Sequence, residues 1–181
     1  MQIDHLERVN QHTLQEVLAL YDAVLFALEN SPDAMSGPGW KRGVYPTEAE
    51  ARAGLEADSL YLLRDEATGR AAATVILDHV QPAAYVNAAW ALAAPPERVM
   101  VVHTFMTDPH LRGRGFGRRA LAAAHTLARE AGCLCVRLDT YAGNLPARAL
   151  YEGMGYDSAG LIDLGFGQYG LHWYQTYELP L

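Results

Sequence analysis

The chain has 181 residues, a length that fits one domain with a single buried core. Half of the residues are hydrophobic and 19% are charged, which excludes a disordered chain. The net charge of −7 argues against non-specific binding to nucleic acid or to an anionic membrane. No apolar run approaches the roughly 20 residues that span a bilayer, and no signal-peptide pattern is present. A single domain over residues 1–181 and a cytoplasmic location are therefore expected.

The first third of the chain is predicted to contain two helices separated by a long loop. Thr13 and Glu16 have the spacing of a capping box, and apolar residues follow at helical spacing. Thr47 and Glu50 form a second capping box, at the start of a shorter helix. The segment Ser31–Pro46 between the helices is rich in glycine and proline, which predicts a loop.

The middle of the chain is predicted to form strands. Leu60–Arg64 and Ala71–His79 are apolar runs joined by a predicted turn. Tyr85–Leu92 is ambiguous between a strand and a loop. Val99–Thr107 is apolar or β-branched except at His103, which predicts a largely buried strand.

A loop rich in arginine and glycine follows this strand. Proline at position 109 ends the strand, and Arg112–Gly117, with the sequence RGRGFG, leads into a stretch of helical composition. Glycines let a backbone turn sharply and approach a ligand closely, and the first N–H groups of a helix attract anions. Two arginines inside the loop, with Arg118 and Arg119 after it, add positive charge. The pattern predicts a phosphate-binding cradle.

The C-terminal part is predicted to alternate strand, helix and strand. Leu134–Thr140 alternates in polarity, and Asn144 is placed to cap a short helix over Pro146–Gly153. Gly160–Gly170 is predicted to be a loop or hairpin, and Leu171–Leu179 a closing strand. The order of all elements predicts a mixed sheet covered by helices.

Two segments resemble motifs of the GNAT superfamily of acyl-CoA-dependent N-acyltransferases. Arg112-Gly-Arg-Gly115-Phe-Gly117 matches the family pattern Arg/Gln-x-x-Gly-x-Gly/Ala between a strand and a helix. The stretch from Asn144 to Tyr156 matches Asn-x-x-Ala-x-x-Leu-Tyr-x-x-x-Gly-Phe/Tyr. Two motifs in this order, separated by one helix and one strand, are far more specific than either alone. The resemblance covers Val99–Tyr156 strongly, as the CoA-binding core, and Gly39–Trp90 more weakly, where it points to small-molecule acetyltransferases of unassigned substrate.

The resemblance implies an α/β fold and a site for acetyl-CoA. The GNAT fold has one mixed, mostly antiparallel, twisted sheet of about six to seven strands flanked by about four helices. Its two central parallel strands splay apart, here Val101–Thr107 and Leu134–Thr140, and the pantetheine arm lies in the gap. The implied cofactor-binding residues are Phe105, Met106, Thr107, Arg112, Gly113, Arg114, Gly115, Phe116, Gly117, Arg118 and Asn144.

The resemblance implies a different role for each part of this set of residues. The Arg112–Gly117 loop binds the pyrophosphate through backbone N–H groups. Backbone groups of Phe105 and Thr107 align the pantetheine arm, and the Phe105 N–H polarises the thioester carbonyl. Asn144 has two interpretations, as a helix cap and as a polar contact to the arm.

Tyr151 matches the family tyrosine that protonates the departing CoA thiolate. A phenol, with a reference pKa near 10, is suited to donate a proton to a thiolate of comparable basicity. The alternative is a core tyrosine on an amphipathic helix.

Two residues are candidates for the base that removes a proton from the attacking amine. His103 lies two residues before Phe105, on the same face if the strand is regular. Its alternative role is a structural histidine bonded to a neighbouring strand. Asp139 is the other candidate, as base or as a partner for the substrate amine, and its alternative is a strand-end carboxylate bonded to nearby backbone or arginine.

The expected function is transfer of an acetyl group from acetyl-CoA to a primary amine of a small molecule. Trp40 and Tyr45 are the candidate acceptor-binding residues, because they lie in a loop that typically borders the family's acceptor site. Direct attack in a ternary complex is expected, since the matched motifs contain no cysteine. The histidines show no ligand spacing, so no metal is expected, and neither nucleic acid nor membrane is an expected partner. Homodimers are common in the family.

The acceptor class stays open at this point. A protein N-terminus or lysine, or a longer acyl group, is an alternative. A non-catalytic acyl-CoA-binding sensor is another.

Overall fold

The computed structural model describes residues 5–31 and 37–181, which form two compact units. The first unit comprises the described residues of Met1–Pro32, Trp40–Leu77 and His103–Thr126; the second comprises those of Asp33–Gly39, Asp78–Val102 and Leu127–Leu181. Strand β4 (Val99–Thr107) and helix α3 (Phe116–Glu130) run from one unit into the other. The expectation of a single domain stays a prediction.

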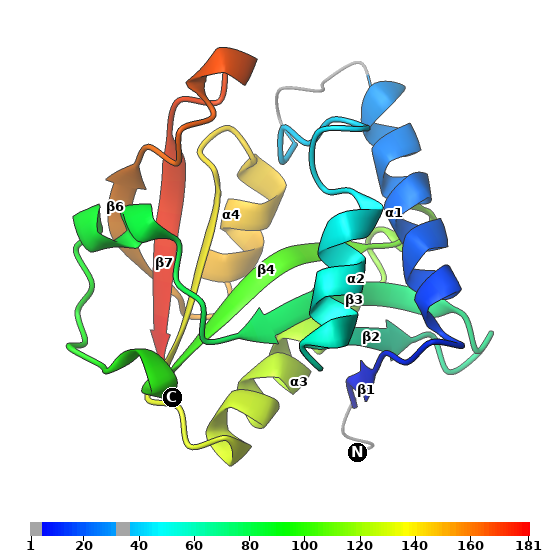
Figure 1. The fold of residues 1–181 in the computed structure, drawn as a ribbon, viewed down its shortest axis with the longest axis horizontal. Helices are drawn as coiled ribbons and strands as arrows, with labels where there is room; N and C mark the ends of the chain where they lie inside the picture. The colour runs from blue at the N-terminus through cyan, green and yellow to red at the C-terminus, as the bar shows by residue number, and fades with distance from the viewer. Residues whose placement is uncertain (1–4, 32–36) are drawn as a thin grey trace. The chain divides into compact units, whose positions relative to one another are not determined.

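Two helices pack on the strands of the first unit (Figure 1). Apolar side chains at helical spacing on the first helix, Val17, Leu20 and Tyr21, are buried against Leu62 and Met106. This spacing gives the helix one apolar face, which removes hydrocarbon from water when it covers the sheet. Besides parts of β4 and α3, the unit contains β1 (Glu7–Arg8), α1 (Leu14–Glu29), α2 (Glu48–Glu56), β2 (Leu60–Arg64) and β3 (Ala71–Asp78).

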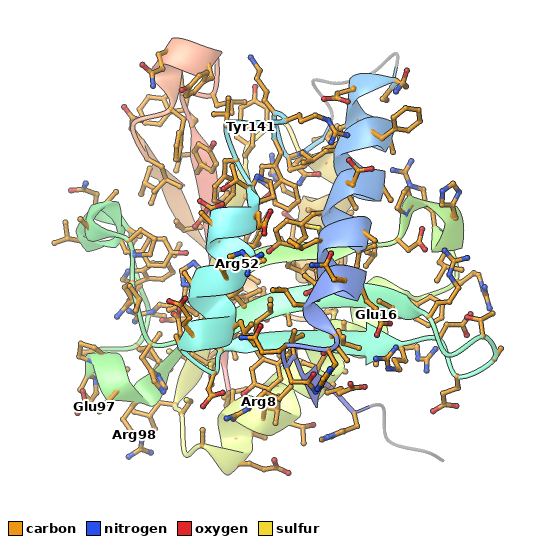
Figure 2. All side chains as sticks on the ribbon, turned by 45° about the vertical axis from the view of Figure 1, so that its right-hand side comes forward. Arg8, Glu16, Arg52, Glu97, Arg98 and Tyr141 are labelled. Carbon is orange, nitrogen blue, oxygen red and sulfur yellow. The ribbon has the colours of Figure 1, made fainter. Side chains whose placement is uncertain are left out.

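The predicted capping box at the start of α1 is wrong. The Thr13 side chain makes no cap bond, and the Asn10 carboxamide oxygen accepts from the N–H groups of His12 and Thr13 instead. Glu16 lies near the start of α1, beside the strands of the first unit (Figure 2). Both of its carboxylate oxygens accept hydrogen bonds from Arg64. A charge-assisted bidentate pair is stronger than a neutral cap bond, so the glutamate turns to the arginine.

The predicted capping box at the start of α2 is confirmed. Thr47 Oγ1 accepts from the Ala49 N–H, and the Glu50 carboxylate accepts from the Thr47 N–H at 2.6 Å. Of the predicted loop Ser31–Pro46, residues 32–36 lie outside the described residues, and residues 37–46 form no helix.

The second unit is built on β5 and β7. The first half of β4 pairs with β5 in parallel, with Val99 opposite Cys135, and β7 pairs with β5 and β6 in antiparallel fashion. Val99, Cys135, Ile162 and Tyr85 belong to its buried core. Its other elements are β5 (Cys135–Tyr141), α4 (Leu145–Glu152), β6 (Asp157–Ile162) and β7 (Tyr174–Pro180).

The predicted fold class is confirmed. The described residues form seven strands, in the order β1-β2-β3-β4-β5-β7-β6, and four α-helices. The β4–β5 pair is parallel, whereas the β1–β2, β2–β3, β5–β7 and β6–β7 pairs are antiparallel. The predicted splay between β4 and β5 involves both units and stays a prediction. No helix in the described ranges is both long and apolar enough to cross a membrane.

One local prediction needs correction, and one open alternative is decided. The first residues of Gly160–Gly170 belong to β6, where the pairing register shifts at Gly160 and its φ is 95°. Glycine inside a strand often marks a bulge, whereas the glycine-rich sequence alone predicts a turn at this position. The ambiguous segment Tyr85–Leu92 is not a strand: it starts within η2 (Ala83–Asn87), a 3-10 turn, and continues without regular structure.

Candidate functional site

The glycine-rich loop of the first unit leaves open space in front of its backbone. Gly113 and Gly115 have φ of 79° and 81°, in the left-handed region that glycine adopts without strain. A Cβ built on either glycine meets no atom within 4 Å. Helix α3 begins at Phe116, inside the predicted loop Arg112–Gly117, and the first N–H groups of a helix have no acceptor within it. Open space in front of a loop and the free N–H groups of a helix start are features that suit a phosphate group.

One arginine of the loop also braces it. The Arg114 guanidinium lies 3.6 Å from the buried Asp65 carboxylate and 5.4 Å from the centre of the Phe116 ring. Arg119 lies over the same ring, at 4.8 Å. The buried Phe116 ring thus packs under two cations that lie close to the loop. Arg114 therefore has a structural partner that the sequence did not suggest.

Strand β4 is irregular at Thr104. Its φ of 49° is left-handed, which is uncommon for any residue except glycine and a marked outlier for a β-branched one. Burial nevertheless alternates along this part of the strand. This alternation is what is expected if His103 and Phe105 share a face of the strand. Both side chains are half-buried, whereas Thr104 and Met106 are buried.

Thr104 contacts one of the candidate acceptor residues. The Tyr45 hydroxyl lies 3.0 Å from Thr104 Oγ1, and the Tyr45 ring meets Trp40 edge-on with ring centres 6.2 Å apart. Trp40 itself packs against the core of the first unit. The two aromatics expected at the acceptor site are therefore in contact with each other and, through Tyr45, with β4.

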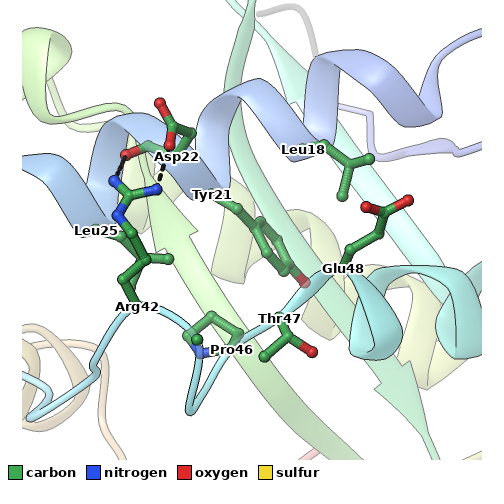
Figure 3. Close-up of a pocket in the computed structure, with 9 residues that line it drawn as sticks. Leu18, Tyr21, Asp22, Leu25, Arg42, Pro46, Thr47 and Glu48 are labelled. Atoms are coloured by element: carbon green, nitrogen blue, oxygen red, sulfur yellow. Dashed lines mark hydrogen bonds and ion pairs between the residues drawn. The ribbon is translucent and has the colours of Figure 1, made fainter.

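A surface pocket of about 340 Å³ lies between α1 and the start of α2 (Figure 3). Leu18, Tyr21 and Leu25 of α1 form its apolar side, and Arg42, which is bonded to Asp22, lies at its edge. The Tyr21 hydroxyl is buried at this pocket. Burial, and then the neighbouring Tyr45, raises the pKa of Tyr21. Its phenol therefore stays protonated over the physiological range.

In the second unit, Asn144 caps α4 as predicted. Its carboxamide oxygen accepts from the Ala147 N–H at 3.4 Å, and its amide donates to Thr140 Oγ1 at 2.9 Å. The side chain is only 8% exposed. Asn144 thereby joins the end of β5 to the start of α4.

Tyr151 is on α4, and its ring lies in a cluster of aromatic side chains. Its ring centre is 5.8 Å from that of Tyr156 and 5.7 Å from that of Tyr177, and the side chain is buried. Burial, then the negative charge of Asp139, raises the pKa of Tyr151. A phenol in this environment stays protonated at neutral pH, as a proton donor must.

Asp139 on β5 accepts a hydrogen bond from a residue that the sequence did not single out. The Tyr85 hydroxyl donates to Asp139 Oδ2 at 2.8 Å. A buried tyrosine is thus one partner of this carboxylate.

Residues 25–156 match the family model described as the Acetyltransferase (GNAT) family. The chain belongs to the GNAT acetyltransferase family. The GNAT protein is 37% identical over 76 residues to "Uncharacterized N-acetyltransferase YhfO" of Bacillus subtilis (strain 168), a match that spans 42% of this chain and 48% of YhfO. The matched part thus covers about half the length of that relative.

Solved structures of similar fold cover nearly the whole GNAT chain. One is an acetyltransferase of the GNAT family from Streptococcus agalactiae 2603, at 15% identity and TM-score 0.75, over 98% of this chain and 95% of that chain. Another is the ribosomal-protein-S18-alanine N-acetyltransferase from Escherichia coli, at 16% identity and TM-score 0.67, over 98% of this chain and 93% of that chain. At this identity the likeness shows the fold alone.

The predicted site residues of the GNAT protein divide between its two units. The second unit holds Asn144, Tyr151 and Asp139. Among the described residues, no group of three or more His, Cys, Asp or Glu side chains is placed to hold a metal ion. The first unit holds the β4 residues His103, Phe105, Met106 and Thr107, the loop and helix start Arg112, Gly113, Arg114, Gly115, Phe116, Gly117 and Arg118, and the aromatic pair Trp40 and Tyr45.

Sequence reasoning missed three residues near these positions. Thr104 gave no signal, because a threonine inside an apolar run predicts an ordinary strand residue. Tyr21 fits the apolar face of a helix, so the sequence gives no sign of a role for its hydroxyl. Tyr85 lies in a segment of ambiguous structure, and its bond to Asp139 joins positions 54 residues apart.

Proposed function

We propose that this GNAT protein transfers an acetyl group from acetyl-CoA to a primary amine of a small molecule. The observation that carries the proposal is the open glycine cradle at the start of α3. Both glycines take left-handed φ, and the space where a Cβ would stand is open. A phosphate oxygen can therefore approach the loop backbone closely enough to accept hydrogen bonds from it. Metal ions play no part in this proposal.

The cradle is proposed to bind the CoA pyrophosphate. Its backbone donors come from Gly113, Gly115 and the first turn of α3, and Arg112 and Arg118 add positive charge. Arg114 braces the loop through Asp65. Helix-end donors and arginines act together on a doubly charged group, so the pyrophosphate accounts for most of the donor affinity.

The end of β4 is proposed to align the reacting thioester. Backbone groups of Phe105, Met106 and Thr107 bond to the pantetheine arm, with Asn144 as a polar contact. The Phe105 N–H donates to the thioester carbonyl oxygen as negative charge develops on it. One such donor is typically worth about 3 kcal/mol in the transition state.

Tyr151 is proposed as the general acid. The amine nitrogen forms a bond to the acetyl carbon, the carbon–sulfur bond breaks, and the departing sulfur takes a proton from the Tyr151 hydroxyl. Burial keeps this phenol protonated before the reaction, so its proton is available as negative charge develops on the departing sulfur. The family tyrosine at this position in the motif supports the assignment.

His103 or Asp139 is proposed to remove the proton from the attacking amine. His103 directly precedes Thr104 on β4, and Asp139 lies on β5 with one carboxylate oxygen bonded to Tyr85. Trp40 and Tyr45 are proposed to border the acceptor. A net charge of −7 favours cationic amines over anionic acceptors.

A protein N-terminus is the second candidate acceptor. The likeness to a ribosomal-protein-S18-alanine N-acetyltransferase structure is the observation that favours it. A screen for CoA release decides between the two. Propylamine, 2-phenylethylamine, spermidine, leucinamide and an alanyl decapeptide are offered with acetyl-CoA. Acetylation of a small amine with at least tenfold higher kcat/KM than the peptide supports the proposal, and the reverse preference contradicts it.

The same screen tests the non-catalytic alternative. Tight acetyl-CoA binding without CoA release from any of the five acceptors would make the chain an acyl-CoA-binding sensor.

A further inference from the structure

The long connection between β3 and β4, residues 79–98, is held in the second unit by specific bonds. It contains only two short 3-10 turns, η2 (Ala83–Asn87) and η3 (Pro96–Arg98), and η2 lies beside β6 (Figure 1). Connections longer than about 12 residues with little regular structure are uncommon in compact domains and usually functional when ordered. We call this connection the strap.

A buried ion pair fixes the middle of the strap. Arg137 and Glu178 lie 2.9 Å apart, with side chains 5% and 2% exposed. Glu178 Oε2 accepts from the N–H groups of Ala91 and Leu92, both at 3.0 Å. Arg137 donates to the Leu92 carbonyl at 2.7 Å and to Gln81 Oε1 at 2.8 Å. The charges of β5 and β7 thus have strap groups as their hydrogen-bond partners.

The same anchor fixes Tyr85. The Trp90 ring lies 4.4 Å from the Arg137 guanidinium and packs against the Tyr85 ring with centres 5.0 Å apart. Its indole N–H donates to the Tyr85 carbonyl at 2.8 Å. Tyr85 is therefore held at its backbone and at its ring, and the side chain is 2% exposed.

Apolar packing accounts for the ring of Tyr85 but not for the presence of its hydroxyl group. Phenylalanine would fill the same apolar space, and a buried phenol is costly unless it is hydrogen-bonded. This hydroxyl donates to Asp139 Oδ2 at 2.8 Å, across 54 residues of sequence. A hydrogen bond to a carboxylate favours its ionised form and restricts its rotation.

We propose that Tyr85 is a positioning residue for acyl transfer, whose hydroxyl orients the Asp139 carboxylate toward the acceptor amine. The inference rests on the proposed function and on the role of Asp139 within it. The strap, pinned by Arg137 and Glu178, is the support that holds Tyr85 in place. Burial, and then the charge of Asp139, raises the pKa of Tyr85, so its hydroxyl remains a donor throughout the working range.

A double-mutant cycle in kinetics tests this pair. Tyr85→Phe, Asp139→Asn and the double variant are compared with the wild type, using acetyl-CoA and whichever of the five acceptors is acetylated fastest. We expect Tyr85→Phe to lower kcat/KM for the amine about tenfold, as for loss of a bond to a charged group, with KM for acetyl-CoA unchanged. The double variant should be no slower than Asp139→Asn, because the hydroxyl acts through the carboxylate.

Two further variants separate positioning from loss of structure. Tyr61→Phe is the matched control, since it removes a hydroxyl that accepts a bond from Arg8, and its kinetics should equal the wild type. Trp90→Phe keeps an aromatic ring and removes the N–H bond to Tyr85. It should lower the same kcat/KM by a smaller factor.

The results distinguish a failure of the inference about Tyr85 from a failure of the proposed acyl transfer. Wild-type kinetics in Tyr85→Phe, or additive losses in the double variant, would overturn the inference while leaving acyl transfer intact. So would a loss that appears equally in KM for acetyl-CoA and in Tm, because that describes a structural role. Failure of the wild type to release CoA with any of the five acceptors would overturn the proposed function, and the inference with it.

Discussion

The Arg137 guanidinium and the Glu178 carboxylate form an ion pair at 2.9 Å that is almost fully removed from water. Removing one partner of such a pair leaves a charge buried without compensation, which typically costs about 3–5 kcal/mol. Glu178→Leu also removes the acceptor of the Ala91 and Leu92 N–H groups. We expect Glu178→Leu to lower the free energy of unfolding by about that amount, measured by urea denaturation.

The exposed pair Glu48 and Arg52 is the control for this prediction. The two side chains are 54% and 51% exposed and lie four residues apart on α2. Exposed pairs of this kind contribute about 0.3–0.5 kcal/mol, so Glu48→Leu should change stability little. Glu178→Gln, which keeps an acceptor oxygen but loses the charge, should fall between the two. Equal effects of Glu178→Leu and Glu48→Leu would contradict the importance of the buried pair.

Tyr151→Phe tests the general acid. The variant keeps the ring that packs against Tyr156 and Tyr177 and loses only the hydroxyl. We expect kcat to fall about 100-fold, at the low end for general acid–base catalysis, with the Kd for acetyl-CoA within a few-fold. Stopped-flow detection of CoA thiol and calorimetric titration of acetyl-CoA measure the two quantities.

Tyr156→Phe is the matched control for the acid. It removes another buried hydroxyl from the same aromatic cluster. Its kcat should stay near that of the wild type. If both variants lose kcat to the same extent, the cluster supports the fold and Tyr151 has no special part in proton transfer.

The parts of this molecule that could be predicted from sequence depend on local signals. The bounds of β4 were predicted as Val99–Thr107 and observed as such, because apolar content and a following proline act within a few residues. The helix start after Arg112–Gly117 and the cap at Asn144 have the same local character. The two family motifs are also local in sequence, and the donor-site residues that they imply stay a prediction.

What could not be predicted depends on partners far away in the sequence. Glu16 fits a capping box, but Arg64, 48 residues away, takes its carboxylate. The left-handed φ of Thr104 runs against the preference of its residue type, and strain of this kind is set by the surrounding structure. The Tyr85–Asp139 bond depends on the fold of the strap, which has no periodic pattern to read.

Alkaline pH should destabilise the protein through its buried tyrosines. Burial raises the pKa of Tyr21, Tyr151 and Tyr156 above the ordinary value near 10. In the unfolded chain these phenols ionise near pH 10, whereas in the folded chain they keep their protons to higher pH. The contribution of these tyrosines to the free energy of unfolding is therefore fully present below pH 10. It is lost as the pH rises through their pKa values in the folded protein.

The expected slope is about 1.4 kcal/mol of unfolding free energy per pH unit for each such tyrosine. Urea titrations between pH 9 and 11 measure it, and absorbance at 295 nm reports phenolate. Tyr156→Phe should reduce this slope by about 1.4 kcal/mol per pH unit, the amount expected for one tyrosine. A slope unchanged in this variant would mean that Tyr156 ionises in the folded protein as easily as in the unfolded chain.

The last prediction concerns the cradle at Gly115. Gly115→Val places a branched side chain in space that is open in the protein and that the proposal assigns to the pyrophosphate. It also forces a β-branched residue to φ near 81°, which costs of order 1–3 kcal/mol in stability. Gly69→Val carries the same backbone penalty, since Gly69 has φ of 69° and open space around its Cβ position, in the turn between β2 and β3. Both variants should have a lower Tm than the wild type. Only in Gly115→Val should acetyl-CoA fail to raise the Tm. A normal rise in Gly115→Val would mean that the pyrophosphate binds elsewhere, because a valine side chain and a phosphate group cannot share this space.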